Sequence, residues 1–152
     1  MLHLQNLKYG ILLSTTAVAT NADSGTYVDT DGFDEAVAVI QLGVCTATNA
    51  PTTIQLEQGD TTSSFTAITG YTGGTASTNG FTIAAQSTAA ATTATYVLPL
   101  VKGIGWNKRY INLKVRLAGG TANVTGVLIL GRAKSAPVTA AEVNATVLAN
   151  PA

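Results

Sequence analysis

The chain has 152 residues, a length typical of one domain and long enough to bury a core without disulfides or metals. Charged residues make up 11% of it, against about 25% in an average globular protein, and its net charge is zero. A neutral chain that is 46% apolar is expected to fold, and its neutrality argues against a nucleic-acid-binding protein.

The charged residues are divided between the two halves of the chain. Residues 1–76 carry one base and seven acids, whereas residues 77–152 carry seven bases and one acid, so the halves have net charges of −6 and +6. If the two sets meet inside one fold they pair locally, and if they lie on opposite sides they give a dipolar subunit that joins head to tail. The sequence leaves both arrangements open.

Neither an internal disulfide bond nor a membrane-spanning helix is expected. The single cysteine, Cys45, has no partner for an internal disulfide. The apolar run from Gly10 to Val18 is far shorter than the roughly 20 residues that a membrane-spanning helix needs, and no clear secretory signal surrounds it. A surface covered by Thr, Ser, Asn and Gln costs less free energy to desolvate than a charged one. Such a surface suits burial against neighbouring subunits.

Apolar and polar residues alternate with a period of two, which predicts β-strands. In chain order, strands are expected over residues 7–17, 26–29, 36–42, 53–57, 65–68, 95–101, 109–117 and 124–130. The alternation is clearest in 109–117. The nearly all-apolar 124–130 predicts a central strand covered on both faces, and Gly119-Gly120 before it predicts a hairpin loop between these two strands. Pro99, which lacks a backbone donor, indicates an edge or a bulge.

About eight antiparallel strands with turn signals between them predict an all-β fold, a β-sandwich or jelly roll. One domain is expected over residues 1–137. Within it, residues 70–95 are rich in Ala, Thr and Gly and predict a long loop, interrupted by a short strand at 81–84.

Residues 138–152 are expected to form a C-terminal arm. The capping-box pattern from Thr139 to Glu142 favours a short helix there. The β-branched Val143 and Val147 favour instead an extended segment lying on a neighbouring subunit. Both forms remain open from the sequence.

Catalytic or metal-binding chemistry is not expected. Oxygen ligands alternate around a glycine in Asp29-Thr-Asp31-Gly-Phe-Asp34-Glu35, as in calcium loops, but the twelfth loop position falls on Ile40 and the flanks are predicted strands. An Asx-type turn is therefore the preferred interpretation. The one histidine, His3, lies near a terminus, and Cys45 follows an apolar strand as a packing residue. We expect no enzyme, no metal and no cofactor.

The main candidate for an interaction site is a basic loop that contains aromatic residues. Such a combination can bind single-stranded nucleic acid, but overall neutrality and the lack of a known module argue against that partner. We expect instead a subunit-facing loop in which the tryptophan anchors an interface. The candidate interaction residues are Trp106, Lys108, Arg109 and Tyr110 in this loop, with Val143 and Val147 in the arm.

Three segments, in order, resemble a family of short phage virion proteins. They are Val28-Asp-Thr-Asp-Gly-Phe-Asp34, Ile54-Gln-Leu-Glu-Gln-Gly-Asp60, and Gly105-Trp-Asn-Lys-Arg-Tyr-Ile111 with its continuation through Leu113 to Leu117 and Val127-Leu-Ile-Leu-Gly-Arg-Ala-Lys-Ser-Ala-Pro-Val138. The Lys-Arg-Tyr strand and the closing Leu-Gly…Ala-Pro-Val are the most specific parts. The insert at 70–95 and the tail beyond Pro137 depart from the family pattern.

The resemblance implies a head decoration or cement protein with a β-sandwich or jelly-roll fold. Such a protein sits on the outside of an expanded phage head as a homotrimer and binds the major capsid protein across capsomer seams. The expected location is the virion, after synthesis in the host cytoplasm, without a nucleic-acid or membrane partner.

Two alternatives are another virion component, from the tail or fibre base, and a carbohydrate-binding β-sandwich module. The second usually displays several exposed aromatics on one face, and no predicted strand here carries two on one face.

Overall fold

The computed structural model describes residues 7–14, 17–18, 21–45, 48–74, 80–83 and 92–133, which form ten strands and no helix. The strands are β1 (Lys8–Leu13), β2 (Ala17–Val18), β3 (Asn21–Asp29), β4 (Phe33–Cys45), β5 (Pro51–Thr61), β6 (Ser64–Gly74), β7 (Gly80–Thr82), β8 (Thr92–Val101), β9 (Tyr110–Leu117) and β10 (Ala122–Ala133). Among these residues there is thus no helix that is long and apolar enough to span a membrane.

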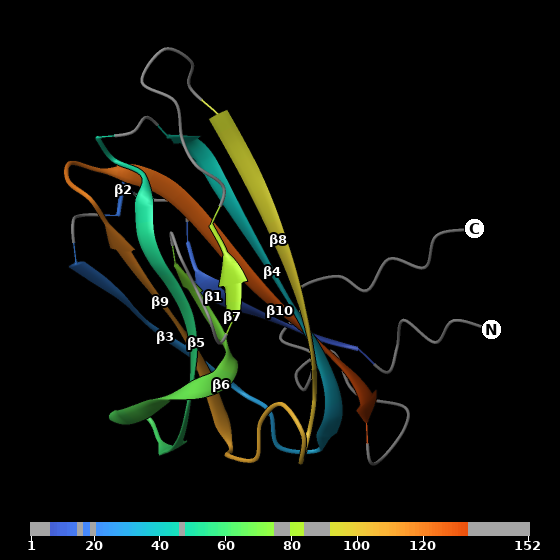
Figure 1. The fold of residues 1–152 in the computed structure, drawn as a ribbon. Coiled ribbons are helices and arrows are strands. Elements are labelled where there is room, and N and C mark those ends of the chain that lie inside the picture. Colours follow the sequence, from blue (N-terminus) through green and yellow to red (C-terminus); the bar gives the residue numbers. More distant parts are fainter. Residues whose placement is uncertain are drawn as a thin grey trace, which may run out of the picture.

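The strands form two layers that pack against each other (Figure 1). The first sheet has the order β1-β10-β4-β8, with the short β2 paired to β10, and the second sheet has the order β3-β9-β5-β6-β7. The paired strands are antiparallel except β6 and β7, which run parallel. The predicted all-β sandwich is therefore confirmed.

The eight main strands pair in a nested order. β5 pairs with β6, β4 with β8, β3 with β9 and β1 with β10, so each strand of the first half meets the strand at the mirrored place in the second half. The chain is in effect one long hairpin wound around a core. Two four-stranded sheets built in this way make a jelly roll, and β2 and β7 are short additions to it.

The core lies between the sheets and is built by alternate residues of the central strands. On β9 the inward residues Ile111, Leu113 and Val115 are fully buried, and on β10 Val124 and Leu128 are equally buried. Fully burying one such side chain stabilises the fold by about 1.5–3 kcal/mol. On β9 the period-two pattern of the sequence therefore identifies the inward face correctly.

The loop at Gly119-Gly120 is not a hairpin loop. β9 belongs to the second sheet and β10 to the first, so the connection passes from one layer of the sandwich to the other. The reason is that each strand already has two partners: β9 lies between β3 and β5, and β10 between β1 and β4. Strand β10 is central, as predicted, but only its inward face is fully buried, and its outward residues are half-buried.

The prediction of a loop over residues 70–95 is wrong at both ends. Residues 70–74 continue strand β6, and β8 already begins at Thr92. Both extensions have a neighbour to pair with, since Gly74 lies opposite Thr53 of β5 and Thr92 opposite Cys45 of β4. The predicted short strand is present as β7, and the predicted arm at 138–152, with Val143 and Val147, lies outside the described residues.

Candidate binding surfaces

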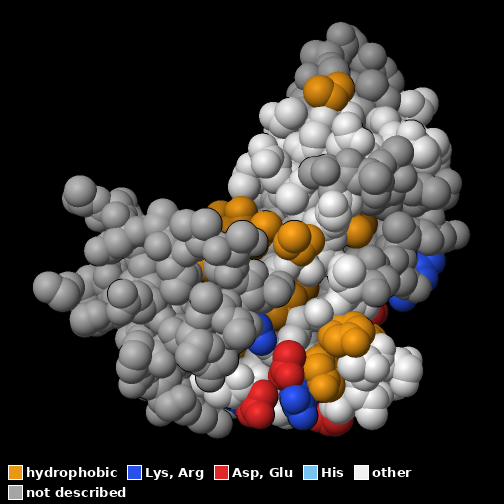
Figure 2. All heavy atoms as spheres, turned by 180° about the vertical axis from the view of Figure 1, so that it is seen from behind, with side chains coloured by type: hydrophobic (Ala, Val, Ile, Leu, Met, Phe, Trp, Pro, Cys, Tyr) orange, Lys and Arg blue, Asp and Glu red, His pale blue; other side chains and the backbone are white. Residues whose placement is uncertain are grey.

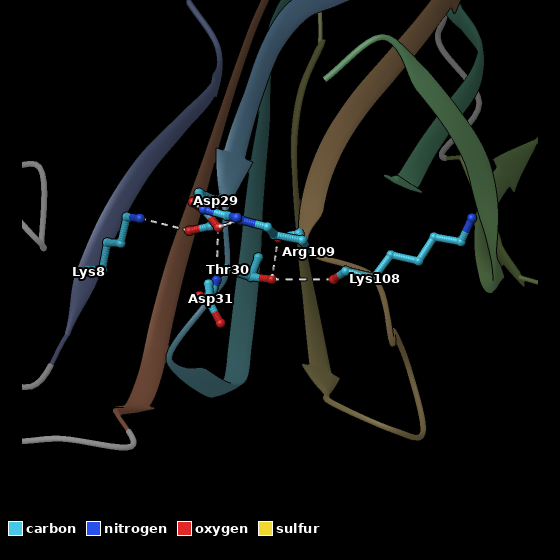
Figure 3. Close-up of polar contacts among 6 residues, drawn as sticks. All are labelled: Lys8, Asp29, Thr30, Asp31, Lys108 and Arg109. Atoms are coloured by element: carbon cyan, nitrogen blue, oxygen red, sulfur yellow. Dashed lines mark hydrogen bonds and ion pairs between the residues drawn. The ribbon is translucent and has the colours of Figure 1, made fainter. Parts of the chain in front are cut away.

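The first candidate surface is a cluster of charged residues where the end of β3 meets the segment before β9 (Figure 3). Arg109 donates Nε–H and Nη2–H to the Asp29 carboxylate over 2.8–3.2 Å. The backbone N–H of Asp31 donates to Asp29 Oδ1 at 3.0 Å, and the ammonium of Lys8 donates to the Asp29 carbonyl oxygen at 2.7 Å. The Asx-type turn predicted at Asp29 is thus confirmed.

The protonation of this pair follows from its contacts. Hydrogen bonds from the Arg109 guanidinium lower the pKa of the Asp29 carboxyl despite its partial burial, and Asp29 in turn raises the pKa of Arg109. The guanidinium carbon also lies 5.2 Å from the ring centroid of Tyr110.

Figure 2 shows charged side chains of both signs gathered beside hydrophobic ones at one end of the face drawn, while most of the other described surface carries no charge.

Trp106 does not lie on this surface. Only 1% of it is exposed, and its indole N–H donates to the Thr30 hydroxyl, which in turn donates to the Arg109 carbonyl oxygen. The expectation that Trp106 anchors an interface is therefore wrong for this structure, because the ring fills the core and fixes the loop from inside. The other residues of the loop remain outside: Lys108 and Tyr110 are half-buried and Arg109 is exposed, so their interaction role stays a prediction.

The acidic and basic halves of the chain meet within one subunit. Asp29 pairs with Arg109, Asp60 with Lys108 at 3.5 Å, and Glu57 with Lys114 at 3.7 Å. Each pair joins an acid of the first half to a base of the second half. The open question of where the two charge sets pair is answered for these six residues.

The second candidate surface is the outward face of the first sheet, which is apolar. In register across β1, β10, β4 and β8 this face carries one row of four branched residues and a second row of mostly apolar residues. The rows are Ile11, Val127, Val39 and Val97, and Tyr9, Ile129, Val37 and Pro99. Ile11 is 57% exposed and Val97 is 59% exposed. We call these eight residues the apolar face.

The third candidate surface is a hollow of about 340 Å³ on the outward side of the second sheet. Its lining includes the ion pair Glu57–Lys114, the buried Asn112, and the aromatic rings of Tyr27 and Phe65. Period-two alternation correctly predicts that Asn112 and Lys114 face away from the core. It does not predict that they become covered, because the covering residues come from the β5–β6 turn.

Metal-ligating residue types do not cluster in the described part of the chain. No group of three or more His, Cys, Asp or Glu there could hold a metal ion. The Cys45 thiol is fully buried, and burial raises its pKa, which disfavours the reactive thiolate. His3, the one histidine of the chain, lies outside the described residues.

No protein-family model matches the chain, and no curated protein matches it either. Among solved structures it is similar to one described as "Crystal structure of SPBc2 prophage-derived protein YomS". The identity is 10%, the TM-score is 0.39, and the match covers 83% of this chain and 93% of that chain. A likeness this distant carries no argument about function.

Proposed function

We propose that this chain is a structural component of a phage particle, namely a decoration or cement subunit of the head. Its partner in this proposal is the major capsid protein, which it binds across capsomer seams from the outside, as a homotrimer. Two observations support the proposal besides the resemblance of residues 28–138. The jelly-roll sandwich is a fold of viral capsid proteins, although it also serves lectins and by itself does not decide between them.

The observation that carries the proposal is the apolar face. The outward, solvated face of an antiparallel sheet normally carries polar residues. Here the outward face carries one row of four apolar residues, Ile11, Val39, Val97 and Val127. Contiguous exposed apolar surface of this kind marks sites of protein association. Glu35, at one end of β4, is the only acid or base on this strand's outward side in the described structure.

The size of the apolar face fits an assembly with repeated contacts. With strands about 4.8 Å apart and residues about 3.3 Å apart, two rows on four strands, about four residues long, present roughly 250 Å². Burying that face against a partner removes roughly 500 Å² in total, less than the roughly 1,200–2,000 Å² of a stable two-body interface. A lone contact is therefore weak, and several contacts made at once by an oligomer on a lattice become strong.

The proposal is tested by sedimenting the purified protein with undecorated, expanded heads and then heating the heads. We expect saturable binding at a fixed ratio to the capsid protein and survival of decorated heads at higher temperature. Val97→Asp is expected to fold, since it changes an exposed residue of an edge strand. It should weaken binding by about 2 kcal/mol or more, roughly 30-fold, because it places an unpaired carboxylate in the contact.

Ile104→Asp is the matched control. Ile104 is 90% exposed and lies in the turn before Trp106, and it is not one of the eight residues of the apolar face. We expect this variant to bind heads like the wild type. Loss of binding with Ile104→Asp but not with Val97→Asp would move the contact to the loop around Lys108 and Arg109. No binding of folded wild-type protein to heads would contradict the proposal and favour a tail or fibre-base component.

A further inference from the structure

The hollow on the second sheet has the dimensions of a small-molecule site. Its volume of about 340 Å³ lies within the range of roughly 300–1,000 Å³ that is usual for ligand pockets. The floor is formed where β3, β9 and β5 run side by side: Tyr27 lies opposite Asn112, which lies opposite Glu57. Three strands that are distant in sequence thus present one side chain each to the same spot.

The floor of the hollow is a set of converging polar groups. Lys114 Nζ lies 3.7 Å from Glu57 Oε1, and Asn112 donates its side-chain N–H to Glu57 Oε2 at 3.5 Å. The side chains of Lys114 and Glu57 are 21% and 12% exposed. A carboxylate, an amide and an ammonium group side by side offer both acceptors and donors to a ligand that carries several hydroxyl groups.

One wall of the hollow is aromatic. Tyr27 is 45% exposed, and its ring lies 6.4 Å from that of Phe65 and 5.4 Å, edge to face, from that of Tyr110. The face of an aromatic ring carries partial negative charge and attracts the weakly positive C–H groups of an apolar ligand face. Tyr27 and Phe65, which line the hollow, come from β3 and β6, and therefore no single strand needs to carry two rings. Tyr110 of β9 packs against Tyr27 and is not part of the lining.

A close backbone approach holds the β5–β6 turn in place beside the hollow. A Cβ at Gly59 would lie 2.2 Å from the carbonyl oxygen of Ser64 and 3.1 Å from the Phe65 ring. Only glycine at this position lets the end of the β5–β6 turn fold over the outward side of β5. That folding places the hydroxyl-bearing Thr62 and Ser63 on the rim of the hollow, together with Phe65.

The geometry points to a saccharide-binding site in this hollow. A pyranose ring has one apolar C–H face, which matches the Tyr27 and Phe65 rings, and an edge of hydroxyl groups, which matches Glu57, Asn112 and Lys114. The floor is too polar for a lipid chain. A phosphate-bearing ligand fits poorly, since Lys114 is the one base in the lining and it is paired with Glu57. The site takes a terminal, uncharged sugar residue of a glycan.

The inference is tested on the purified full chain without phage heads, so its outcome is independent of the proposed head binding. The probes are the methyl glycosides of glucose, galactose, mannose and N-acetylglucosamine, titrated while the side-chain amide signals are followed by NMR. We expect at least one probe to bind saturably in the millimolar range and to shift the Asn112 amide signal.

Tyr27→Ala should weaken that binding about tenfold by removing the stacking face, and Tyr27→Phe should retain it. Tyr9→Ala is the matched control, since Tyr9 lies on the outward side of the first sheet and its removal should leave sugar binding unchanged. Absence of binding by all four probes to the wild type would overturn the inference. So would binding that Tyr27→Ala leaves at full strength, or shifts that spare Asn112.

Discussion

The Asp29 side chain ties together segments from three parts of the chain. Its carboxylate accepts hydrogen bonds from Arg109 and from the turn at Asp31, and its carbonyl oxygen accepts one from Lys8. The hydrogen bonds from Arg109 place the pKa of Asp29 in the folded state below its ordinary value of 3.8. The resulting stability is therefore present above pH 3.8 and is lost as the pH falls through the lower, folded-state pKa.

The lowered pKa of Asp29 predicts a measurable loss of folding stability at low pH. When the unfolding free energy is measured from pH 7 down to pH 2, the wild type should lose stability below about pH 4, and Asp29→Asn should lose less of it. Asp34→Asn, which changes a nearby acid outside the Arg109 pair, is the control and should keep the slope of the wild type. An equal slope for Asp29→Asn and the wild type would show that the pair does not contribute.

At the scale of the elements, Gly126 of β10 faces Leu113 of β9 across the core. A Cβ at Gly126 would lie 2.5 Å from Leu113 Cδ2 and 3.3 Å from Leu12 Cβ, and both leucines are fully buried. Gly126 thus gives the Leu113 side chain the space it occupies. The absence of a side chain at Gly126 therefore serves the packing of the two sheets.

We therefore expect Gly126→Ala to destabilise the fold. The added methyl group overpacks the core, and the free energy of unfolding should fall by about 1–3 kcal/mol in denaturant titrations. The matched control is Gly74→Ala in β6, where the nearest atom to a new Cβ is the Thr52 carbonyl oxygen at 3.9 Å. That control should be neutral or slightly stabilising, and a larger loss there than at Gly126 would contradict the packing argument.

At the scale of the whole molecule, the nested strand pairing brings the acidic and basic parts of the chain together. Because strands of the first half pair with strands of the second half, acids in the first and bases in the second become neighbours, as in Glu57–Lys114 and Asp29–Arg109. Pairing of either half with a copy of itself would instead bring like charges together, which is unfavourable. The segregated charges therefore favour the correct strand pairs.

The same topology predicts that neither half folds alone. Residues 1–61 contain β1 to β5, which include β1, β3 and β4, whose partners β10, β9 and β8 lie in residues 62–152. Each fragment should show no cooperative thermal transition by circular dichroism, and an equimolar mixture should regain one, if the fragments stay soluble. A cooperative transition in the isolated fragment 1–61 would contradict the nested dependence of the two halves.

Local pattern determined the strands and their inward faces. Alternation along 109–117 identified buried residues such as Ile111 and Leu113, and Asp29-Thr-Asp31 identified a turn, because side-chain direction in a strand and in an Asx turn depends only on neighbours. Composition likewise indicated a weakly charged surface. These features depend on residues within a few positions of one another, and the sequence alone therefore sufficed for them.

Only the tertiary structure decided which strands are neighbours, and with that the candidate sites. Trp106 was expected at a surface but lies in the core, because the buried Thr30 offers its indole a hydrogen-bond partner 76 residues away. Tyr27, Phe65 and Tyr110 each point outward by their own strand's alternation, yet they meet only because β3, β9, β5 and β6 are adjacent. Strand adjacency depends on long-range pairing and core packing, which period-two alternation does not encode.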